Sequence, residues 1–487
     1  MWGPCALITS PLIAGILSNF HGSRGMQSNG AWAREVFGTA KLGDARVVSR
    51  TVRVAEAAAE RPSGRVTAVC RSAAEREGAY RLLERARFDV AQLTSAVTSH
   101  GAVGCQGHAR VLVPVDQTGL SVADRQQRKD IGRILHANSN RQGLQVMSAL
   151  AMTPDGVPLG LLAQQWHRRP DAKSPDEKHD PRPPEQRESA LWRRALTASV
   201  AQLATHSPTT RPWFLLDRGG DARQVLRWAN EHRGTADVTL RNAYNRRLIG
   251  GGHLRPRVLR QKVAGHVHVH VRASRGRGRN RPARIARCTV RHKVVQLNIS
   301  SHCDGVEPVE VSVVHVREQR ARRSKPIEWW LLSTCQVSSF QDAVEVINAY
   351  TRRWRIEELH YTWKSGACDI ESSQLRSQKP LQIWATILAA VAVRIERLKH
   401  LSRNHPDLPA SEELSQDEVD AAIALSRTAK HSIGDSLSIL DAVLLIAQVG
   451  GYAAKPSKSP PGSKVLSRGF DRVLAAAEAI RVVRSSG

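Results

Sequence analysis

The stretch "YTRRWRIEELHYTWKSG" (residues 350–366) sets basic, aromatic and acidic residues at helical spacing. At about 100° per residue, Tyr350, Arg353, Glu357 and Lys364 fall within one narrow stripe of a helix. One acid among three phosphate-capable groups fits a metal ligand beside a phosphate backbone. The alternative is a surface helix stabilised slightly by an Arg353–Glu357 pair. That alternative does not explain Tyr350 and Lys364 on the same line.

The charge balance of the whole chain points to a polyanionic partner. The 487 residues include 72 Lys and Arg against 44 Asp and Glu, which gives a formal net charge of +28. Nucleic acid is the simplest partner for such a surplus. A membrane surface is the competing interpretation, but no long apolar span or basic amphipathic helix supports it.

Length and composition indicate a folded chain of about three domains. Hydrophobic residues make up 41% of the chain and charged residues 24%, a profile typical of folded proteins. The 7 cysteines are scattered and form no CxxC, which favours reduced thiols in a cytoplasm. Residues 5–17 are apolar but too short to span a bilayer, and Met26 precedes the globular part. We therefore expect residues 1–25 to be an upstream extension or the product of a mis-called start.

Apolar periodicity predicts helices at both ends of the chain and an α/β region between them. The expected domains are an unstructured extension at 1–29, a helical DNA-binding domain at 30–105, an α/β catalytic domain at 106–375 and a helical domain at 376–487. Short alternating runs such as "HVHVHVRAS" (266–274) indicate a β insertion at about 236–335 within the α/β domain.

Two acids end predicted strands of the α/β region. "RVLVPVD" (110–116) closes on Asp116, and "RPWFLLD" (211–217) closes on Asp217. Open α/β sheets place their sites at the carboxyl ends of strands. Together with Glu357, these acids could hold two divalent metals for phosphodiester chemistry. The alternative is that both are turn residues or helix N-caps.

The spacing Y-(2)-R-(3)-E-(6)-K resembles the signature of the insertion-sequence-four group of bacterial cut-and-paste transposases. Tyr350, Arg353, Glu357 and Lys364 match all four positions. The resemblance extends over residues 31–400. It includes the stretches "LGDARVVSRTVRVA" (42–55), "EREGAYR" (75–81), "VDQT" (115–118), "LLDRGGD" (215–221), "RES..W" (187–192), "NRPAR" (280–284) and "WWLLST" (329–334).

The resemblance implies an RNase H-like catalytic core with a β-strand insertion, flanked by helical domains. It implies that Asp116, Asp217 and Glu357 bind two Mg²⁺ or Mn²⁺ ions and are catalytic. Tyr350, Arg353 and Lys364 would then contact phosphates, and Trp329 would stack on a flipped base. The sequence departs from the family pattern at three positions, Gln117, Gly219 and Tyr361, none of which is a member of the acidic triad.

Further DNA contacts are expected outside that signature. Trp354 and Arg218 adjoin the predicted acids. The arginine-glycine loop offers phosphate contacts through Arg275, Arg277, Arg279 and Arg281, although a charged hairpin tip would look the same. In contrast, His266, His268 and His270 are expected to face solvent or phosphate without binding metal, because they lie in line on one strand. Four tryptophans are expected in the core, namely Trp166, Trp192, Trp213 and Trp228.

The expected protein is a DNA transposase that cleaves transposon ends, forms a hairpin intermediate and joins the ends to target DNA. The expected partners are double-stranded terminal inverted repeats, target DNA and a second copy of the chain bound through the C-terminal helices. The expected place is the nucleoid of a bacterial cytoplasm. Two alternatives remain open: an RNase H-like structure-specific nuclease, and a catalytically inactive protein that binds transposon ends.

Overall fold

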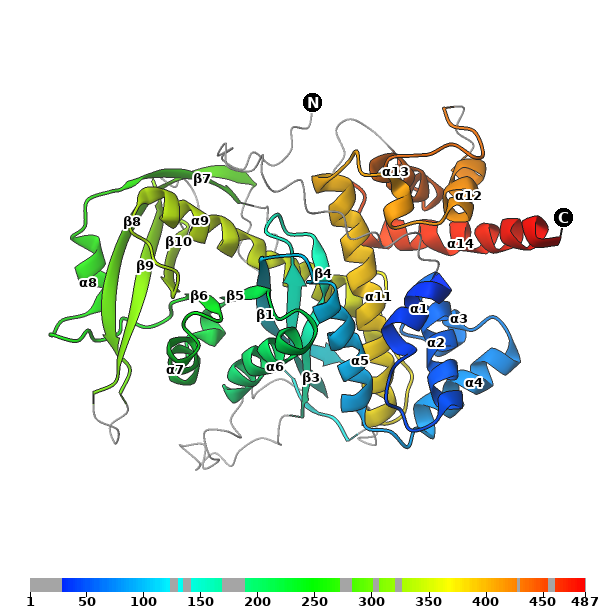
Figure 1. The fold of residues 1–487 in the computed structure, drawn as a ribbon, viewed down its shortest axis with the longest axis horizontal. Helices are drawn as coiled ribbons and strands as arrows, with labels where there is room; N and C mark the ends of the chain where they lie inside the picture. Colours follow the sequence, from blue (N-terminus) through cyan, green and yellow to red (C-terminus); the bar gives the residue numbers. More distant parts are fainter. Residues whose placement is uncertain are drawn as a thin grey trace.

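One mixed sheet extends from one end of the molecule to its centre (Figure 1). The computed structural model describes residues 29–122, 130–134, 142–168, 189–271, 283–300, 306–319, 326–426, 430–453 and 460–486. Within these ranges the strands are β1 (Arg110–Ser121), β2 (Gly132–Arg133), β3 (Gln142–Met152), β4 (Pro158–His167), β5 (Arg211–Leu216), β6 (Asp237–Arg241), β7 (Gly265–Val271), β8 (Arg284–Asn298), β9 (Pro308–Glu318) and β10 (Glu328–Ser333).

The strand order is β2-β3-β1-β5-β6-β10-β9-β8-β7, and β4 pairs with β3. Antiparallel β1, β3 and β4 are followed by β5 and β6, which run parallel to β1. β10 joins β6 antiparallel, so the β-rich segment extends the same sheet. β6 lies within the range assigned from the sequence to the insertion, yet it pairs in parallel with β5.

Helices cover the sheet and form the other end of the molecule (Figure 1). They are α1 (Asn29–Phe37), α2 (Ala45–Glu60), α3 (Val66–Val69), α4 (Ala73–Glu84), α5 (Val90–Val103), α6 (Ala190–His206), α7 (Arg223–Glu231), α8 (Leu254–Leu259), α9 (Phe340–Thr351), α10 (Arg355–Lys364), α11 (Gln378–Asn404), α12 (Gln416–Ser426), α13 (Ile439–Val449) and α14 (Ser463–Ser486).

Capping residues in the sequence set where several helices begin. The Asp44 side chain accepts a hydrogen bond from Arg46 N at the start of α2. Ser72 and Glu75 form a capping box on α4, and Ser339 and Asp342 form one on α9. Such caps satisfy backbone N–H groups that the first turn leaves unpaired.

α11 is the central helix of the fold. Its apolar run at 381–394 is buried in a core shared with α1–α5 and with one face of β1 and β3. A second core lies between the opposite face of the sheet and α6 and α7, and it contains Trp192 and Trp228. The apolar run of α11 is therefore internal packing, although its sequence was equally consistent with a subunit interface.

Other expectations have clear outcomes in the described residues. No helix of the described part is both long and apolar enough to cross a bilayer. The described cysteines are free thiols, as predicted. The side chains of His266, His268 and His270 are exposed on β7, which confirms that this strand face is open to solvent. Trp213 is buried as predicted, whereas Trp166 is only half-buried.

Candidate active site

Two neighbouring strands bring Asp116 and Asp217 together. Asp116 lies in β1, and Asp217 directly follows β5. The strands run parallel with Val115 opposite Leu216, so the two acids occupy the next position on each strand. Adjacent strands lie roughly 4.8 Å apart. This is the arrangement expected when sites form at the carboxyl ends of parallel strands.

Each aspartate also accepts a backbone hydrogen bond. Asp116 Oδ1 accepts from Gln117 N at 3.0 Å. Asp217 Oδ1 accepts from Gly219 N at 2.7 Å and caps the 3₁₀ turn η4 (Arg218–Gly220). Asp217 is therefore an N-cap through one of its carboxylate oxygens, as the alternative interpretation predicted. The cap does not involve Oδ2, so capping and ligand binding are compatible.

Arg353 joins Glu357 to this pair of acids. Its Nη2 donates to Glu357 Oε1 at 2.5 Å, and its Nη1 lies 3.8 Å from Asp116 Oδ2. The side chains are mostly enclosed, with exposed fractions of 12% for Arg353 and 17% for Asp116. A single guanidinium therefore lies between a carboxylate of β1 and a carboxylate of α10.

The segment that carries Glu357 is not the single straight helix used to calculate the stripe. α9 ends at Thr351, a 3₁₀ turn η5 (Arg352–Trp354) follows, and α10 begins at Arg355. Tyr350 is therefore on a different helix from Glu357. The assumption of 100° per residue from 350 to 364 was wrong across this turn, because a 3₁₀ turn has 3.0 residues per turn.

The carboxyl groups shift one another's pKa in the direction expected of crowded acids. Burial raises the pKa of Asp116 to about 7, Arg353 opposes the rise, and Asp217 and Glu357 add to it. Burial also raises the pKa of Glu357, against Arg353 and with a contribution from Asp217. Three acids that repel one another lie partly out of water here.

This donor set fits a hard divalent cation. Three carboxylates come together from two strand ends and a helix, and Arg353 is the cation that contacts two of them, Asp116 and Glu357. Mg²⁺ and Mn²⁺ prefer carboxylate oxygens. The residues present therefore suit the metal that the sequence predicts, and the identity and number of ions remain predictions.

A second acidic cluster lies on the other side of α10. Ligand atoms of Glu358, Glu396 and His400 lie within 4.8 Å of one another. Lys399 forms an ion pair with Glu396, and Arg355 Nη1 lies 2.9 Å from Glu358 Oε2. His400 and these cations hold the pKa of Glu358 well below its usual range despite burial. The cluster is therefore a charge-balanced network between α10 and α11.

The predicted DNA-contacting residues lie in different surroundings. Tyr350 is buried, and burial raises its pKa to about 12. Its ring packs edge-on against Trp329 with centroids 5.7 Å apart. Lys364 Nζ donates to Thr118 Oγ1 at 3.2 Å and lies 3.5 Å from Glu371 Oε1.

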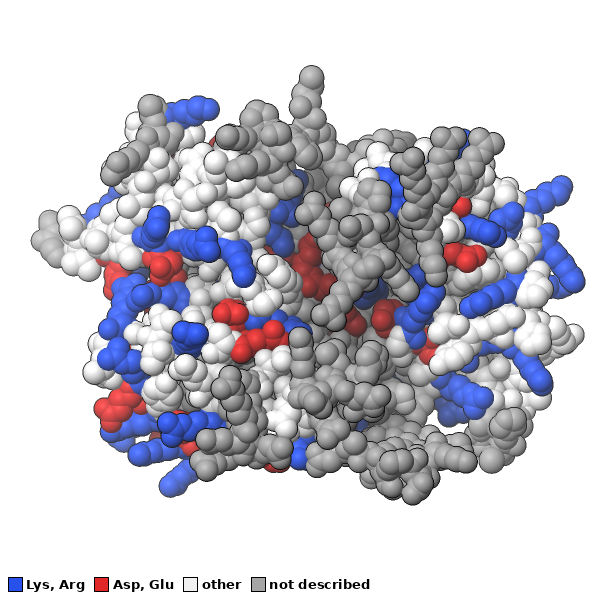
Figure 2. Space-filling model, turned by 180° about the vertical axis from the view of Figure 1, so that it is seen from behind, with Lys and Arg blue, Asp and Glu red and all other residues white. Residues whose placement is uncertain are grey.

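Other predicted contacts are exposed or lie outside the described ranges. Trp354 is 48% exposed on η5, and Arg218 is exposed on η4. Arg275, Arg277, Arg279 and Arg281 fall in the undescribed segment 272–282. On the face drawn in Figure 2, Lys and Arg side chains gather over both ends of the molecule, with Asp and Glu between them.

Strand ends in the sequence do not identify two further residues near the acids, Arg241 and Asp221. Arg241 ends β6, and burial lowers its pKa while Tyr350 and Asp217 act on it from close by. Asp221 is fully buried and accepts from Ala243 N at 2.7 Å and from Arg246 Nη2 at 2.5 Å. Asp221 thus fastens the turn after Asp217 to the loop after β6. The end of β6 could have pointed to this region, because β6 pairs in parallel with β5, the strand that Asp217 follows.

Two family models match separate parts of the chain. Residues 29–88 match the model described as transposase DNA-binding. Residues 193–394 match the model described as transposase DDE domain. The second match contains Asp217, Arg353 and Glu357, and Asp116 lies before its start.

Among solved structures, the chain is similar to a piggyBac transposase in a synaptic complex with hairpin DNA, determined by cryo-EM. The two are 9% identical with a TM-score of 0.35. The alignment covers 67% of this chain and 53% of that chain, so this chain spans about half the length of that protein.

The family matches confirm the prediction of an enzyme with a transposase catalytic domain. The chain is an enzyme that carries a transposase DNA-binding region followed by a transposase DDE domain.

Proposed function

We propose that the chain is a cut-and-paste DNA transposase of the insertion-sequence-four group, with Asp116, Asp217 and Glu357 as its acidic triad. The observation that carries the proposal is that Arg353 contacts both Asp116 and Glu357, while Asp217 follows the strand beside Asp116 and acts on both of these carboxyl groups. Tyr350, Arg353, Glu357 and Lys364 keep the spacing of that group's signature. Asp116 is included because β1 holds it next to Asp217.

The strand order supports an RNase H-like core. Three antiparallel strands, β1, β3 and β4, are followed by β5 and β6 on the other side of β1 and parallel to it. The first acid lies on the central strand β1, and the second follows β5. Strands β7–β10 would then be the insertion, which extends the sheet at the β6 edge.

The reaction proposed is phosphoryl transfer at a transposon end. Water attacks the scissile phosphorus, the P–O bond to the 3′ oxygen breaks, and a 3′-hydroxyl is released. That hydroxyl then attacks a phosphodiester of the opposite strand, which closes a hairpin on the transposon end and releases the flanking DNA with a 3′-hydroxyl. Water opens the hairpin before strand transfer. Two Mg²⁺ ions, when bound, activate the attacking oxygen and stabilise the leaving one. The protein supplies positions and charge, which is most of what in-line displacement needs.

Individual side chains have distinct parts in this proposal. The three carboxylates hold the ions, while Arg353 lies close enough to both Asp116 and Glu357 to keep their carboxylates in place. Lys364, Arg218 and the exposed ring of Trp354 are available to the DNA strand around the scissile phosphate. Trp329 would stack on a flipped base, and its contact with buried Tyr350 fixes the indole ring.

Cleavage of a duplex that carries the DNA flanking the gene tests the proposal. With Mg²⁺, the wild-type protein should nick at the terminal repeat, and Glu357→Gln should lose activity by about a thousandfold or more. Glu412→Ala, an exposed acid on the 3₁₀ turn η7 (Ala410–Glu412), is the matched control and should cleave normally. Equal cleavage by the wild type and Glu357→Gln would remove Glu357 from the triad.

A second copy of the chain is the proposed protein partner. Two transposon ends must be held together, and α14 exposes Val482 by 59% and Val483 by 72%. These exposed side chains, rather than the buried run of α11, offer apolar surface for a homodimer. Because its substrate is DNA, we place the protein at the bacterial nucleoid.

A further inference from the structure

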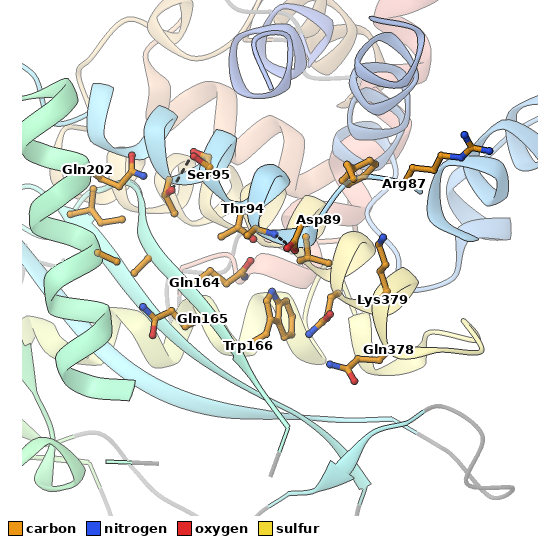
Figure 3. Close-up of a pocket in the computed structure, with 18 of the residues that line it drawn as sticks. Arg87, Asp89, Thr94, Ser95, Gln164, Gln165, Trp166, Gln202, Gln378 and Lys379 are labelled. Carbon is orange, nitrogen blue, oxygen red and sulfur yellow. Dashed lines mark hydrogen bonds between the residues drawn. The ribbon is translucent and has the colours of Figure 1, made fainter. Parts of the chain in front are cut away.

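A groove separates the DNA-binding region from the sheet. It has a cavity volume of about 960 Å³ and lies between the first half of α5, the end of β4 and the start of α11 (Figure 3). Helix α5 packs closely on the beginning of β4, since a Cβ added to Gly101 would lie 2.2 Å from Leu161 O. Further along β4, the residues from Gln164 to Trp166 line the open space instead.

The groove contains buried polar atoms without hydrogen-bond partners. They are Gln164 Nε2, Trp166 Nε1, Gln165 Oε1 and Thr94 Oγ1. Gln164 is only 5% exposed, and its Oε1 already accepts from Thr386 Oγ1 at 3.0 Å, so its amide N–H groups are the unused end. A buried polar group without a partner is unfavourable, so a ligand that offers donors and acceptors gains affinity by meeting these groups.

Neutral and charged side chains occupy different parts of the groove. The depth is lined by neutral amides, hydroxyls and one indole, among them Gln164, Trp166 and Gln382. The charged lining residues are Arg87, Lys379, Asp89 and Asp130, and the Asp89 carboxylate is engaged as the cap of α5. A neutral planar group with hydrogen-bonding edges suits the depth, and the two cations suit a phosphate at the lip.

The groove also lies on the active-site side of the sheet. Gln164 on β4 is opposite Ser148 on β3, which is opposite Asp116 on β1. Two strand spacings amount to roughly 10 Å. Phe88, the last residue of the DNA-binding match, lines the groove as well.

We propose that this groove binds a single unpaired nucleotide of the DNA substrate, with the base in the amide-lined depth and its phosphate at Arg87 and Lys379. The glutamine amides can pair with base edges, and Trp166 supplies an aromatic surface. This inference rests on the proposed function. An extended peptide added to the edge of β4 is the competing occupant. The nucleotide is favoured by the aromatic ring and by the cations at the lip.

Photocrosslinking in EDTA tests the groove apart from cleavage. The probe is a short single strand of thymidylates with one 5-iodouracil base, and a matched strand with an abasic residue at that position is the control. We expect a crosslink that maps to residues 158–167 or 378–382, and about tenfold weaker binding of the abasic strand. Mapping of the crosslink to other parts of the chain would overturn the proposal.

Three variants separate groove binding from general DNA affinity. Gln164→Leu should weaken binding of the base-containing strand by about tenfold and leave binding of the abasic strand unchanged. Ser377→Trp fills the lip at an exposed residue whose side chain forms no cap on α11, so it should block the crosslink without unfolding the protein. Gln448→Leu, on an exposed position of α13, should behave as wild type.

The outcomes also separate this proposal from the proposed function. If the protein cleaves end DNA but binds the base-containing and the abasic strand equally, with or without Ser377→Trp, the groove proposal is wrong and the proposed transposase function stands. A protein that crosslinks in the groove but never cleaves keeps the groove and refutes the catalytic assignment. If an uncharged threonine–glutamine peptide blocks the crosslink and the protein binds base-containing and abasic strands equally, the occupant is a peptide added to the edge of β4 and not a nucleotide.

Discussion

Asp116 is the residue whose surroundings say most about the candidate site. It is the first acid on the central strand, is mostly enclosed, and lies close to Asp217, Glu357 and Arg353. Without a metal, burial and its acidic neighbours outweigh the guanidinium and favour the protonated carboxyl. A bound divalent cation would reverse that balance, because it favours the charged carboxylates.

Metal affinity should therefore depend on pH near neutrality. The pKa of Asp116 is raised to about 7, and that of Glu357 is raised as well. A ligand must lose its proton before it binds metal, so a raised pKa weakens binding on the acidic side. We expect the apparent Kd for Mn²⁺ to rise about tenfold for each pH unit below about 7 and to level off above it.

Calorimetric titration with Mn²⁺ across this pH range measures the effect. In Asp116→Asn, affinity should be lower throughout and the break near neutrality should disappear. A Kd for the wild type that does not change between mildly acidic and neutral pH would show that Asp116 is not a ligand.

At the scale of elements, two different sets of side-chain interactions hold α10 in place. One side carries Glu357 toward Asp116 through Arg353. The other side carries Glu358 into the network with Glu396, Lys399 and His400 of α11. The network fixes the rotation of α10, and so it fixes where Glu357 points.

Loss of one member of that network should be costly. Glu396 is 1% exposed, forms an ion pair with Lys399 and accepts from Thr362 Oγ1 at 2.5 Å. Glu396→Ala leaves the buried Lys399 without its main partner and should lower the free energy of unfolding by about 3–5 kcal/mol. Urea unfolding measures this, with Glu412→Ala expected to change stability by less than about 0.5 kcal/mol. A similar small loss for Glu396→Ala would mean that Lys399 is satisfied elsewhere.

The contact between α5 and β4 predicts opposite effects for two glycines. A Cβ on Gly101 would lie 2.2 Å from Leu161 O, whereas a Cβ on Gly78 in α4 would meet nothing within 4 Å. Gly101→Ala should therefore destabilise by about 1–3 kcal/mol through strain on backbone that cannot yield. Gly78→Ala should stabilise by about 0.5–1 kcal/mol, because alanine favours a helix interior. Thermal unfolding distinguishes them, and a shift of the same sign in both would refute this account of the α5–β4 packing.

What the sequence could and could not predict follows from the range of the interactions. The Arg353–Glu357 pair follows from i,i+4 spacing, and Asp116 beside Asp217 follows from the ends of parallel strands. The role of β6 did not follow, because alternation indicates a strand but not its neighbour, and so Arg241 was missed. The groove at Gln164 depends on β4 being an edge strand and on α5 and α11 meeting there from distant parts of the chain.

At the scale of the whole molecule, the charge distribution bears on how DNA is held. The formal net charge is +28, and Lys and Arg side chains gather over both ends of the face in Figure 2. Strand β1, which carries Asp116, lies between the two ends of the molecule (Figure 1). A long duplex can therefore be gripped at several points while the carboxylates meet one scissile phosphate.

Affinity for DNA should then fall steeply with salt. A protein that neutralises several phosphates releases as many counterions, and log K falls with log salt by about 0.9 per phosphate on duplex DNA. With roughly six to ten contacts, we expect a loss of about a thousandfold or more between low and moderate salt. Fluorescence anisotropy of a labelled terminal duplex measures the slope.

Lys364→Ala should lower the slope by about one, because Lys364 lies beside the strand that carries Asp116. Trp354→Ala removes an exposed ring but no charge, so it should weaken binding without changing the slope. A nearly flat salt response would show that the surplus of basic residues does not face the DNA.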